Sequence, residues 1–166
     1  MAEAMSTAEP GETKAEAYAR VAKEIAAIVA GEPSATARYA TAACLLAQNF
    51  GPRFFWTGFY IVDPDKPDEL VVGPYQGTLG CLRIPFGRGV CGAAAATGET
   101  QRVPDVHAFE GHIACDSRSQ SEIVVPVFNA DGQLTAVLDV DSAELDAFDA
   151  EDQAGLEAIC EALLTG

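Results

Sequence analysis

Five cysteines give this chain its most reactive side chains: Cys44, Cys81, Cys91, Cys115 and Cys160. Their odd number and the lack of a C-x-x-C pair argue against a structural disulfide framework, a thioredoxin-like motif and a zinc ribbon. Cys44 and Cys160 fall within expected helices, where a cysteine is by default a small buried hydrophobe. The other three fall in or beside expected loops, where a thiol in a reducing compartment is of interest as a catalytic or redox-sensing group.

Cys115 lies in the long polar segment Pro104–Ser121, which also holds both histidines, His107 and His112. A loop of this length inside a compact domain is usually functional or disordered. The polar neighbours of Cys115, among them Arg118, favour its thiolate more than an apolar helix face would. The segment therefore indicates a nucleophilic thiol, with an ordinary loop cysteine as the alternative.

Cys81 and Cys91 flank a loop, and Cys91 belongs to its glycine-rich part, residues 86–92, FGRGVCG. This segment matches neither a phosphate-binding P-loop nor the dinucleotide-binding G-x-G-x-x-G pattern. Together with Cys115, the two cysteines can form a transient disulfide. They can also form a zinc site completed by His107 or His112, although the spacing is not that of familiar zinc sites.

Three acidic residues occur among apolar residues of two expected strands. Asp139 and Asp141 are two positions apart, so they share one face of a strand. Glu122 begins the neighbouring strand. Adjacent carboxylates repel unless a cation or a shared proton compensates, so the cluster indicates a pocket for an ammonium group. The alternative is that the strand has already frayed into a turn and both aspartates face water.

An aromatic cluster forms the strand expected at Phe54–Val62. Strand alternation places Trp56, Gly58 and Tyr60 on one face and Phe55, Thr57 and Phe59 on the other. Most of these rings are expected in the core. One face can nevertheless wall an apolar pocket for a small ligand.

The elements that must position these residues follow from periodicity and capping signals. Helices are expected from Thr13, with a capping box to Glu16, as far as Gly31, and from Ser34 to near Asn49. The last helix is expected from Asp149, with the apolar stripe Leu156, Ile159, Cys160, Leu163 and Leu164. Two hairpins are expected, with strands Phe54–Val62 and Glu69–Tyr75, then Glu122–Phe128 and Leu134–Val140. Short strands Cys81–Pro85 and Gln101–Val103 and a short helix Val90–Thr97 lie between the hairpins.

This order predicts an α+β domain with a central antiparallel sheet. The amphipathic N- and C-terminal helices are expected on one face of the sheet and an active-site loop region on the other. Residues 1–12 are predicted to be a flexible segment and residues 13–166 a single domain.

Composition restricts the classes of function. The 166 residues carry a net charge of −15, which repels phosphate backbones and argues against nucleic-acid binding. No apolar run reaches the roughly 20 residues of a membrane helix, and the N-terminus has no secretory pattern. The expected location is the cytoplasm.

Five segments together resemble the free methionine-R-sulfoxide reductases, a family with the GAF fold. They are WTGFY (56–60), GPYQG (73–77), CLRIPFGRGVCG (81–92), HIACDSRSQSEIVVP (112–126) and LDVDS (138–142). The resemblance covers about Val21 to Leu164. A GAF domain of another function would share the fold pattern, but would not be expected to combine these three cysteines with these three acids.

The resemblance implies reduction of free L-methionine-R-sulfoxide without a bound cofactor. It assigns attack on the sulfoxide sulfur to Cys115, resolution of the sulfenic acid to Cys81, and a helper or alternative resolving role to Cys91. Glu122, Asp139 and Asp141 would hold the substrate ammonium and help protonate the sulfoxide oxygen, and Trp56 and Tyr60 would enclose the methyl-sulfinyl end. An external dithiol such as thioredoxin would reduce the disulfide, no metal is implied, and terminal helices of this kind can pair in a homodimer.

Two other functions fit the same residues. A GAF sensor would bind a small ligand or tetrapyrrole and regulate a partner. A redox sensor would form the same disulfide with peroxide without turning over a sulfoxide.

Overall fold

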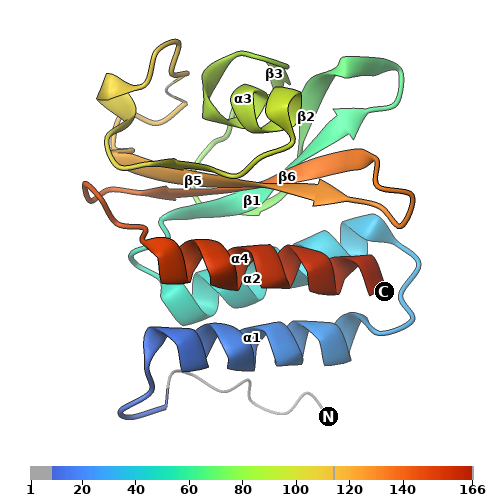
Figure 1. Cartoon of the computed structure of the whole chain (residues 1–166), viewed down its shortest axis with the longest axis vertical. Coiled ribbons are helices and arrows are strands. Elements are labelled where there is room, and N and C mark those ends of the chain that lie inside the picture. Colours follow the sequence, from blue (N-terminus) through green and yellow to red (C-terminus); the bar gives the residue numbers. More distant parts are fainter. Residues whose placement is uncertain (1–8, 114, 166) are drawn as a thin grey trace.

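A six-stranded antiparallel sheet organises the part of the chain that the computed structural model describes, residues 9–113 and 115–165. Its strand order is β3-β2-β1-β6-β5-β4, so the two long hairpins meet at the centre through β1 and β6 (Figure 1). The strands are β1 (Trp56–Asp63), β2 (Lys66–Gln76), β3 (Arg83–Pro85), β4 (Gln101–Val103), β5 (Ser121–Phe128) and β6 (Leu134–Ser142).

The central strands separate two apolar clusters because successive side chains point to opposite faces. Phe59 of β1 and Leu138 of β6 belong to the larger cluster, beneath the helices. Trp56, Tyr60 and Val137 belong to the smaller cluster on the other face. The alternation predicted for β1 and β6 is therefore confirmed, and it decides which face each acidic residue joins.

Three helices, α1 (Lys14–Val29), α2 (Ala35–Phe50) and α4 (Ala150–Ala162), cover the larger cluster on one face of the sheet (Figure 1). Thr13 and Glu16 form the predicted capping box of α1, and Asp149 and Asp152 form that of α4. These boxes satisfy backbone N–H groups that a helix start would otherwise leave unpaired.

The opposite face of the sheet carries α3 (Gly89–Thr97) and the loop that contains the short 3₁₀ helix η1 (Val106–Ala108) (Figure 1). This arrangement confirms the predicted α+β layering, with loops and a short helix opposite the long helices. Of the predicted flexible segment, residues 1–8 lie outside the described residues. Glu12, at its end, forms an ion pair with Arg20, and its carboxylate Oε1 lies 2.7 Å from Arg20 Nε.

Several predicted ends of strands and helices differ from the structure, and two of the differences change where a side chain lies. The first strand begins at Trp56 rather than Phe54, so strand alternation does not apply to Phe55. Phe55 packs with the smaller cluster instead of sharing a face with Phe59. Leu164, placed in the apolar stripe of the last helix, lies beyond the end of α4 and is exposed. Among the described helices, none is both long and apolar enough to cross a membrane.

A buried ion-pair network ties the first helix to the last. Asp152 in α4 has no exposed surface. Its Oδ1 accepts hydrogen bonds from Tyr18 Oη at 2.6 Å and from Arg53 Nη1 at 2.9 Å. Its Oδ2 accepts one from Lys14 Nζ at 3.0 Å. One carboxylate thus joins α1, α4 and the segment before β1.

Replacing Asp152 by alanine is expected to lower the free energy of unfolding by about 3 kcal/mol, because the buried hydroxyl of Tyr18 loses its acceptor and Lys14 and Arg53 each lose one ion pair. Urea unfolding followed by circular dichroism measures the change. The matched control is Glu151→Ala, at the exposed neighbouring position in the first turn, with an expected loss below about 1 kcal/mol. Equal losses in the two variants would contradict the structural role of the network.

Candidate active site

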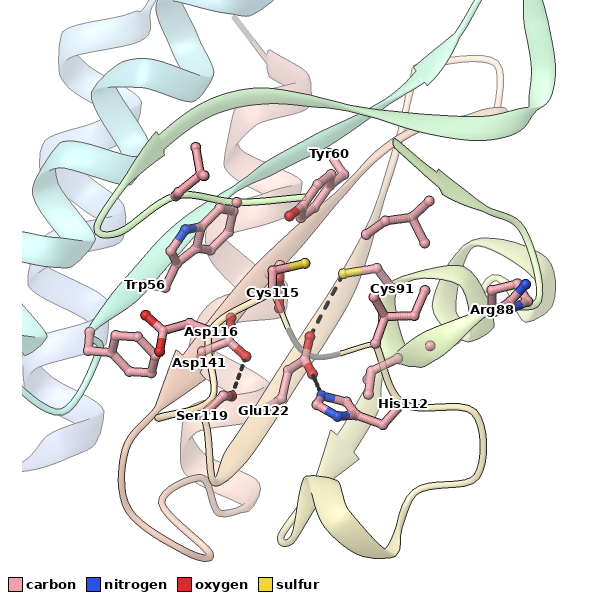
Figure 2. Close-up of a pocket in the computed structure, with 18 residues that line it drawn as sticks. Trp56, Tyr60, Arg88, Cys91, His112, Cys115, Asp116, Ser119, Glu122 and Asp141 are labelled. Atoms are coloured by element: carbon pink, nitrogen blue, oxygen red, sulfur yellow. Dashed lines mark hydrogen bonds and ion pairs between the residues drawn. The ribbon is translucent and has the colours of Figure 1, made fainter. Parts of the chain in front are cut away.

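A cavity opens on the face of the sheet opposite the three long helices. It encloses about 510 Å³, a volume that includes the open solvent at its mouth. Its walls come from β1, β5, β6, the start of α3 and the two loops that carry Cys81 and Cys115. Figure 2 shows the side chains that converge there.

Three carboxyl groups lie together at the floor of this cavity. In the β5–β6 ladder Glu122 pairs with Asp141, and Val124 pairs with Asp139. Glu122 is 5% exposed and Asp139 is 4% exposed. Asp141 is less deeply buried, and its Oδ1 accepts a hydrogen bond from Ser119 Oγ at 2.9 Å. The Asp139 Oδ1 atom is buried without a hydrogen-bond partner among the described residues.

Burial makes these groups hold their protons. Desolvation, followed by the charge of Asp141, raises the pKa of Glu122 to about 8, although hydrogen bonds with Asp139 and Cys91 act in the opposite direction. Desolvation and then Glu122 raise the pKa of Asp139 well above its ordinary value. Desolvation and then Asp139 do the same for the pKa of Asp141. At neutral pH Glu122 therefore holds its proton and can donate it.

Cys91 lies in the first turn of α3 beside these acids. Its Sγ is 3.8 Å from Glu122 Oε1, and the side chain is buried. Desolvation, then the charges of Asp139 and Glu122, raise the pKa of its thiol well above the ordinary value. Cys91 is consequently a neutral thiol, which is a weaker nucleophile than a thiolate.

Cys81 and Cys115 are joined by a disulfide, with their Cα atoms 5.5 Å apart. Cys81 precedes β3 and is partly buried, and Cys115 lies on the loop before β5 and is exposed. The bond therefore links two loops at the mouth of the cavity. It also engages two of the three sulfurs in the alternative zinc set, so that set is not assembled.

A different group of possible cation ligands is present among the described residues. The Cys91 sulfur and one oxygen each of Glu122 and Asp139 lie within 4.8 Å of one another. Such a donor set can hold an ammonium group, or a divalent cation once its protons have left.

Two stacked aromatic rings form the apolar wall. The rings of Trp56 and Tyr60 stack with centroids 5.6 Å apart, and Trp56 also stacks on Tyr75 at 5.0 Å. Trp56 Nε1 donates a hydrogen bond to the carbonyl of Thr78 at 2.8 Å, which fixes its plane. Gly80 passes so close that a Cβ there would lie 2.9 Å from Trp56 Cζ2, so a larger residue would displace the ring.

Comparison with known proteins identifies this arrangement. The GAF domain family model matches residues 37–163. Free methionine-R-sulfoxide reductase of Escherichia coli is 44% identical over 146 residues, covering 88% of this chain and 86% of that protein. The solved structure of free methionine-R-sulfoxide reductase from Neisseria meningitidis in complex with its substrate superposes with a TM-score of 0.89 at 46% identity, covering 97% of this chain and 93% of that one. The chain belongs to the free methionine-R-sulfoxide reductase family of GAF domains.

A second member of this family has a similar structure. The reduced form of fRMsr of Staphylococcus aureus superposes with a TM-score of 0.83 at 40% identity, covering 90% of this chain and 95% of that one. The GAF fold predicted from the sequence is thus confirmed, and the family is one of oxidoreductases.

The structure gathers the predicted site residues around one cavity. Seven of them line it: Trp56, Tyr60, Cys91, Cys115, Glu122, Asp139 and Asp141. Cys81 joins them through its disulfide. Asp139 and Asp141 both lie within β6 and face the cavity, so the alternative of a frayed, water-facing turn is wrong. Their individual roles stay predictions.

Sequence reasoning missed several cavity residues, among them Phe55, Asp116 and Ser119. Asp116 accepts a hydrogen bond from Thr78 Oγ1 at 2.7 Å, and its pair with Arg118 holds the pKa of its carboxyl well below the usual range. Ser119 is 7% exposed within an otherwise polar loop. The run of polar residues after Cys115 indicated a functional loop, but it did not show which of these side chains point into the cavity.

Replacing Glu122 by glutamine is expected to flatten the pH dependence of stability. The carboxyl pKa is about 8 in the folded protein against an ordinary value of 4.5, so between these values only the folded state holds the proton. Rising pH then favours unfolding, and each such group contributes a slope of up to about 1.4 kcal/mol per pH unit. Urea unfolding at pH 5, 6, 7 and 8 measures the slope.

The matched control for this series is Glu110→Gln, at an exposed position of the loop before β5. Its curve is expected to run parallel to that of the unmodified protein. The stability of Glu122→Gln, relative to the unmodified protein, is expected to rise steadily from pH 5 to pH 8. Parallel curves for all three proteins would show that Glu122 is not a buried neutral acid.

Proposed function

We propose that this protein reduces free L-methionine-R-sulfoxide to L-methionine through its own cysteine thiols. One observation carries the proposal: the disulfide between Cys81 and Cys115 opens onto a cavity whose floor is three adjoining carboxyl groups. A redox-active sulfur, a source of protons and a place for an ammonium group are thereby within one site. The substrates named for the similar proteins of Escherichia coli and Neisseria meningitidis support the same reaction.

The carboxyl groups supply the binding site for the substrate ammonium. A cation favours the charged form of a neighbouring carboxyl group, so the ammonium can draw a proton off Asp139 or Asp141 and pair with the resulting carboxylate. The partnerless Oδ1 of buried Asp139 supports this assignment, because a buried oxygen without a hydrogen bond gains most from a donor. A pocket closed around an ammonium group also excludes a peptide chain, which explains a preference for the free amino acid.

The methyl-sulfinyl end of the substrate is assigned to the stacked rings of Trp56 and Tyr60. Both side chains are nearly fully buried and form an apolar wall on β1 beside the acids of β6, where Trp56 pairs with Asp141. Apolar contact on one side and hydrogen bonding on the other would orient the sulfoxide with its sulfur toward Cys115.

The chemistry needs one thiolate, one proton and a second thiol. The Cys115 thiolate attacks the sulfoxide sulfur, a neutral carboxyl such as that of Glu122 protonates the oxygen, and methionine leaves as Cys115 becomes a sulfenic acid. The Cys81 thiol then displaces the hydroxyl of the sulfenic acid, which releases water and forms the disulfide. The pKa of Cys91, raised by its burial, disfavours it as the attacking group and supports a role as helper.

The reaction is tested by supplying each epimer of free methionine sulfoxide with thioredoxin, thioredoxin reductase and NADPH, and following NADPH loss. Only the R epimer is expected to be turned over. Cys115→Ser is expected to abolish turnover, since the attacking sulfur is lost. Cys44→Ala, which changes a cysteine of α2 outside the cavity, is the control and is expected to retain activity.

Lack of turnover with either epimer, in folded protein with reduced thiols, would contradict the proposed reaction. The same fold would then be assigned to sensing, either of a small ligand or of oxidants through the disulfide. Turnover that persists in Cys115→Ser would instead move the attack to another cysteine.

The reductant is proposed to be a dithiol protein of the thioredoxin type. Cys115 is exposed, and two exposed apolar side chains flank Cys81: Leu79 is 79% exposed and Leu82 is 73% exposed. An approaching dithiol can therefore reach the disulfide and bury apolar surface beside it. Pairing of two copies through the terminal helices stays a prediction.

Leu82→Ser is expected to raise the KM for thioredoxin about fivefold, the equivalent of about 1 kcal/mol of lost apolar contact. The rate supported by dithiothreitol is expected to stay the same, because this small reductant needs no docking surface. Ile28→Ser, at an exposed position on α1 across the sheet, is the matched control. An unchanged KM in Leu82→Ser would place reductant docking elsewhere.

A further inference from the structure

His112 is a polar side chain of the cavity that has no part in the proposed reaction as described so far. His112 lines the cavity from the loop that carries Cys115, and only 14% of its side-chain surface is exposed. Its Nε2 lies 3.7 Å from Oε2 of Glu122, and Figure 2 marks this contact. The other histidine of the loop, His107, is 62% exposed, pairs with Asp105 and does not line the cavity.

The two oxygens of Glu122 face different groups. Oε2 faces the imidazole of His112, and Oε1 faces the sulfur of Cys91. The remaining charged or titratable side chains of the cavity are Tyr60, Arg88, Cys115, Asp116, Asp139 and Asp141. Of these, Cys115 and Asp116 lie on the same loop as His112. His112 is thus the side chain that approaches Glu122 from the loop side, away from the other two acids of the floor.

We propose that His112 is a positioning residue for Glu122, donating its Nε2–H to Oε2 as Glu122 gives its proton to the sulfoxide oxygen. This inference rests on the proposed function, in which Glu122 becomes a carboxylate during the reaction. A hydrogen bond from a neutral donor strengthens when its acceptor becomes charged, so the contact stabilises the product of proton transfer more than the starting acid. A separation of 3.7 Å suits the neutral acid, because catalytic hydrogen bonds are often long before substrate binds.

The protonation states agree with this role. Burial lowers the pKa of His112 below its ordinary value, so the imidazole is neutral at pH 7 and has a single N–H to donate. A neutral histidine leaves the proton on Glu122 until the sulfoxide takes it. A donor to the charged form of a carboxyl also lowers its pKa, so removing the donor should raise the pKa of Glu122 further.

The test compares variants that lack or retain an N–H donor. Reduced protein is mixed with free methionine-R-sulfoxide in the absence of any reductant, and the methionine formed in the first turnover is measured after rapid quenching. His112→Phe is expected to slow this turnover about tenfold, the equivalent of one hydrogen bond to a charged group. His112→Gln, which retains an N–H donor, is expected to stay within about threefold of the unmodified protein.

A pH series separates positioning from packing. The first-turnover rate falls as Glu122 loses its proton, and this fall is expected to move to higher pH in His112→Phe but not in His112→Gln. His107→Phe is the matched control, on the same loop but outside the cavity, and is expected to leave rate and profile unchanged. If His112→Phe does not fold, His112→Ala replaces it as the variant without a donor.

The outcomes distinguish this inference from the proposed function. If the unmodified protein forms no methionine, the proposed function fails. The role of His112 is overturned, while the proposed function stands, if the unmodified protein forms methionine and the variant without a donor keeps the full rate. The same conclusion follows if that variant slows only as much as His112→Gln and the pH dependence of its rate does not shift.

Discussion

The structure depends on the burial of three carboxyl groups on one face of a single pair of strands. The β5–β6 register places Glu122 opposite Asp141, and alternation turns Asp139 to the same face. Away from water such groups must keep their protons or meet a cation. The apolar cavity, with Trp56 and Tyr60 as its wall, therefore creates both an acid and a cation site from side chains that would be ordinary carboxylates at the surface.

The same constraint distinguishes the cysteines. Cys91, on the first turn of α3, shares the dry environment of the acids and keeps its proton. Cys81 and Cys115 lie on loops at the mouth of the cavity, where one is exposed and the two are close enough to be bonded. The thiols of this chain thus differ in protonation and accessibility, because the strands at the floor of the cavity are buried and the loops at its mouth are accessible. The helices on the far face supply the packing that keeps this floor rigid.

Local signals were sufficient to predict the elements of the fold. Capping boxes at Thr13 and Asp149 and the period-two pattern of β1, β5 and β6 depend on neighbouring residues, so they can be found in the sequence. The least reliable predictions concerned the ends of strands and helices, as at Phe55 before β1 and Leu164 after α4. The end of an element depends on where its tertiary contacts cease. Of the cavity residues, Ser119 was missed because a polar loop gives no local signal of which side chains turn inward.

The sequence by itself determined the α+β architecture, the shared face of Asp139 and Asp141, and, through a resemblance spread over five segments, the family. The resemblance named Cys81 as the resolving cysteine and Cys91 as the alternative, and in the tertiary structure Cys81 is bonded to Cys115. Only the tertiary structure decided that His112 approaches Glu122. It also decided that Glu122 is buried enough to hold its proton at neutral pH. The physical reason is that periodicity assigns a residue to a face, whereas sulfur–sulfur pairing and desolvation depend on distances between segments far apart in the chain.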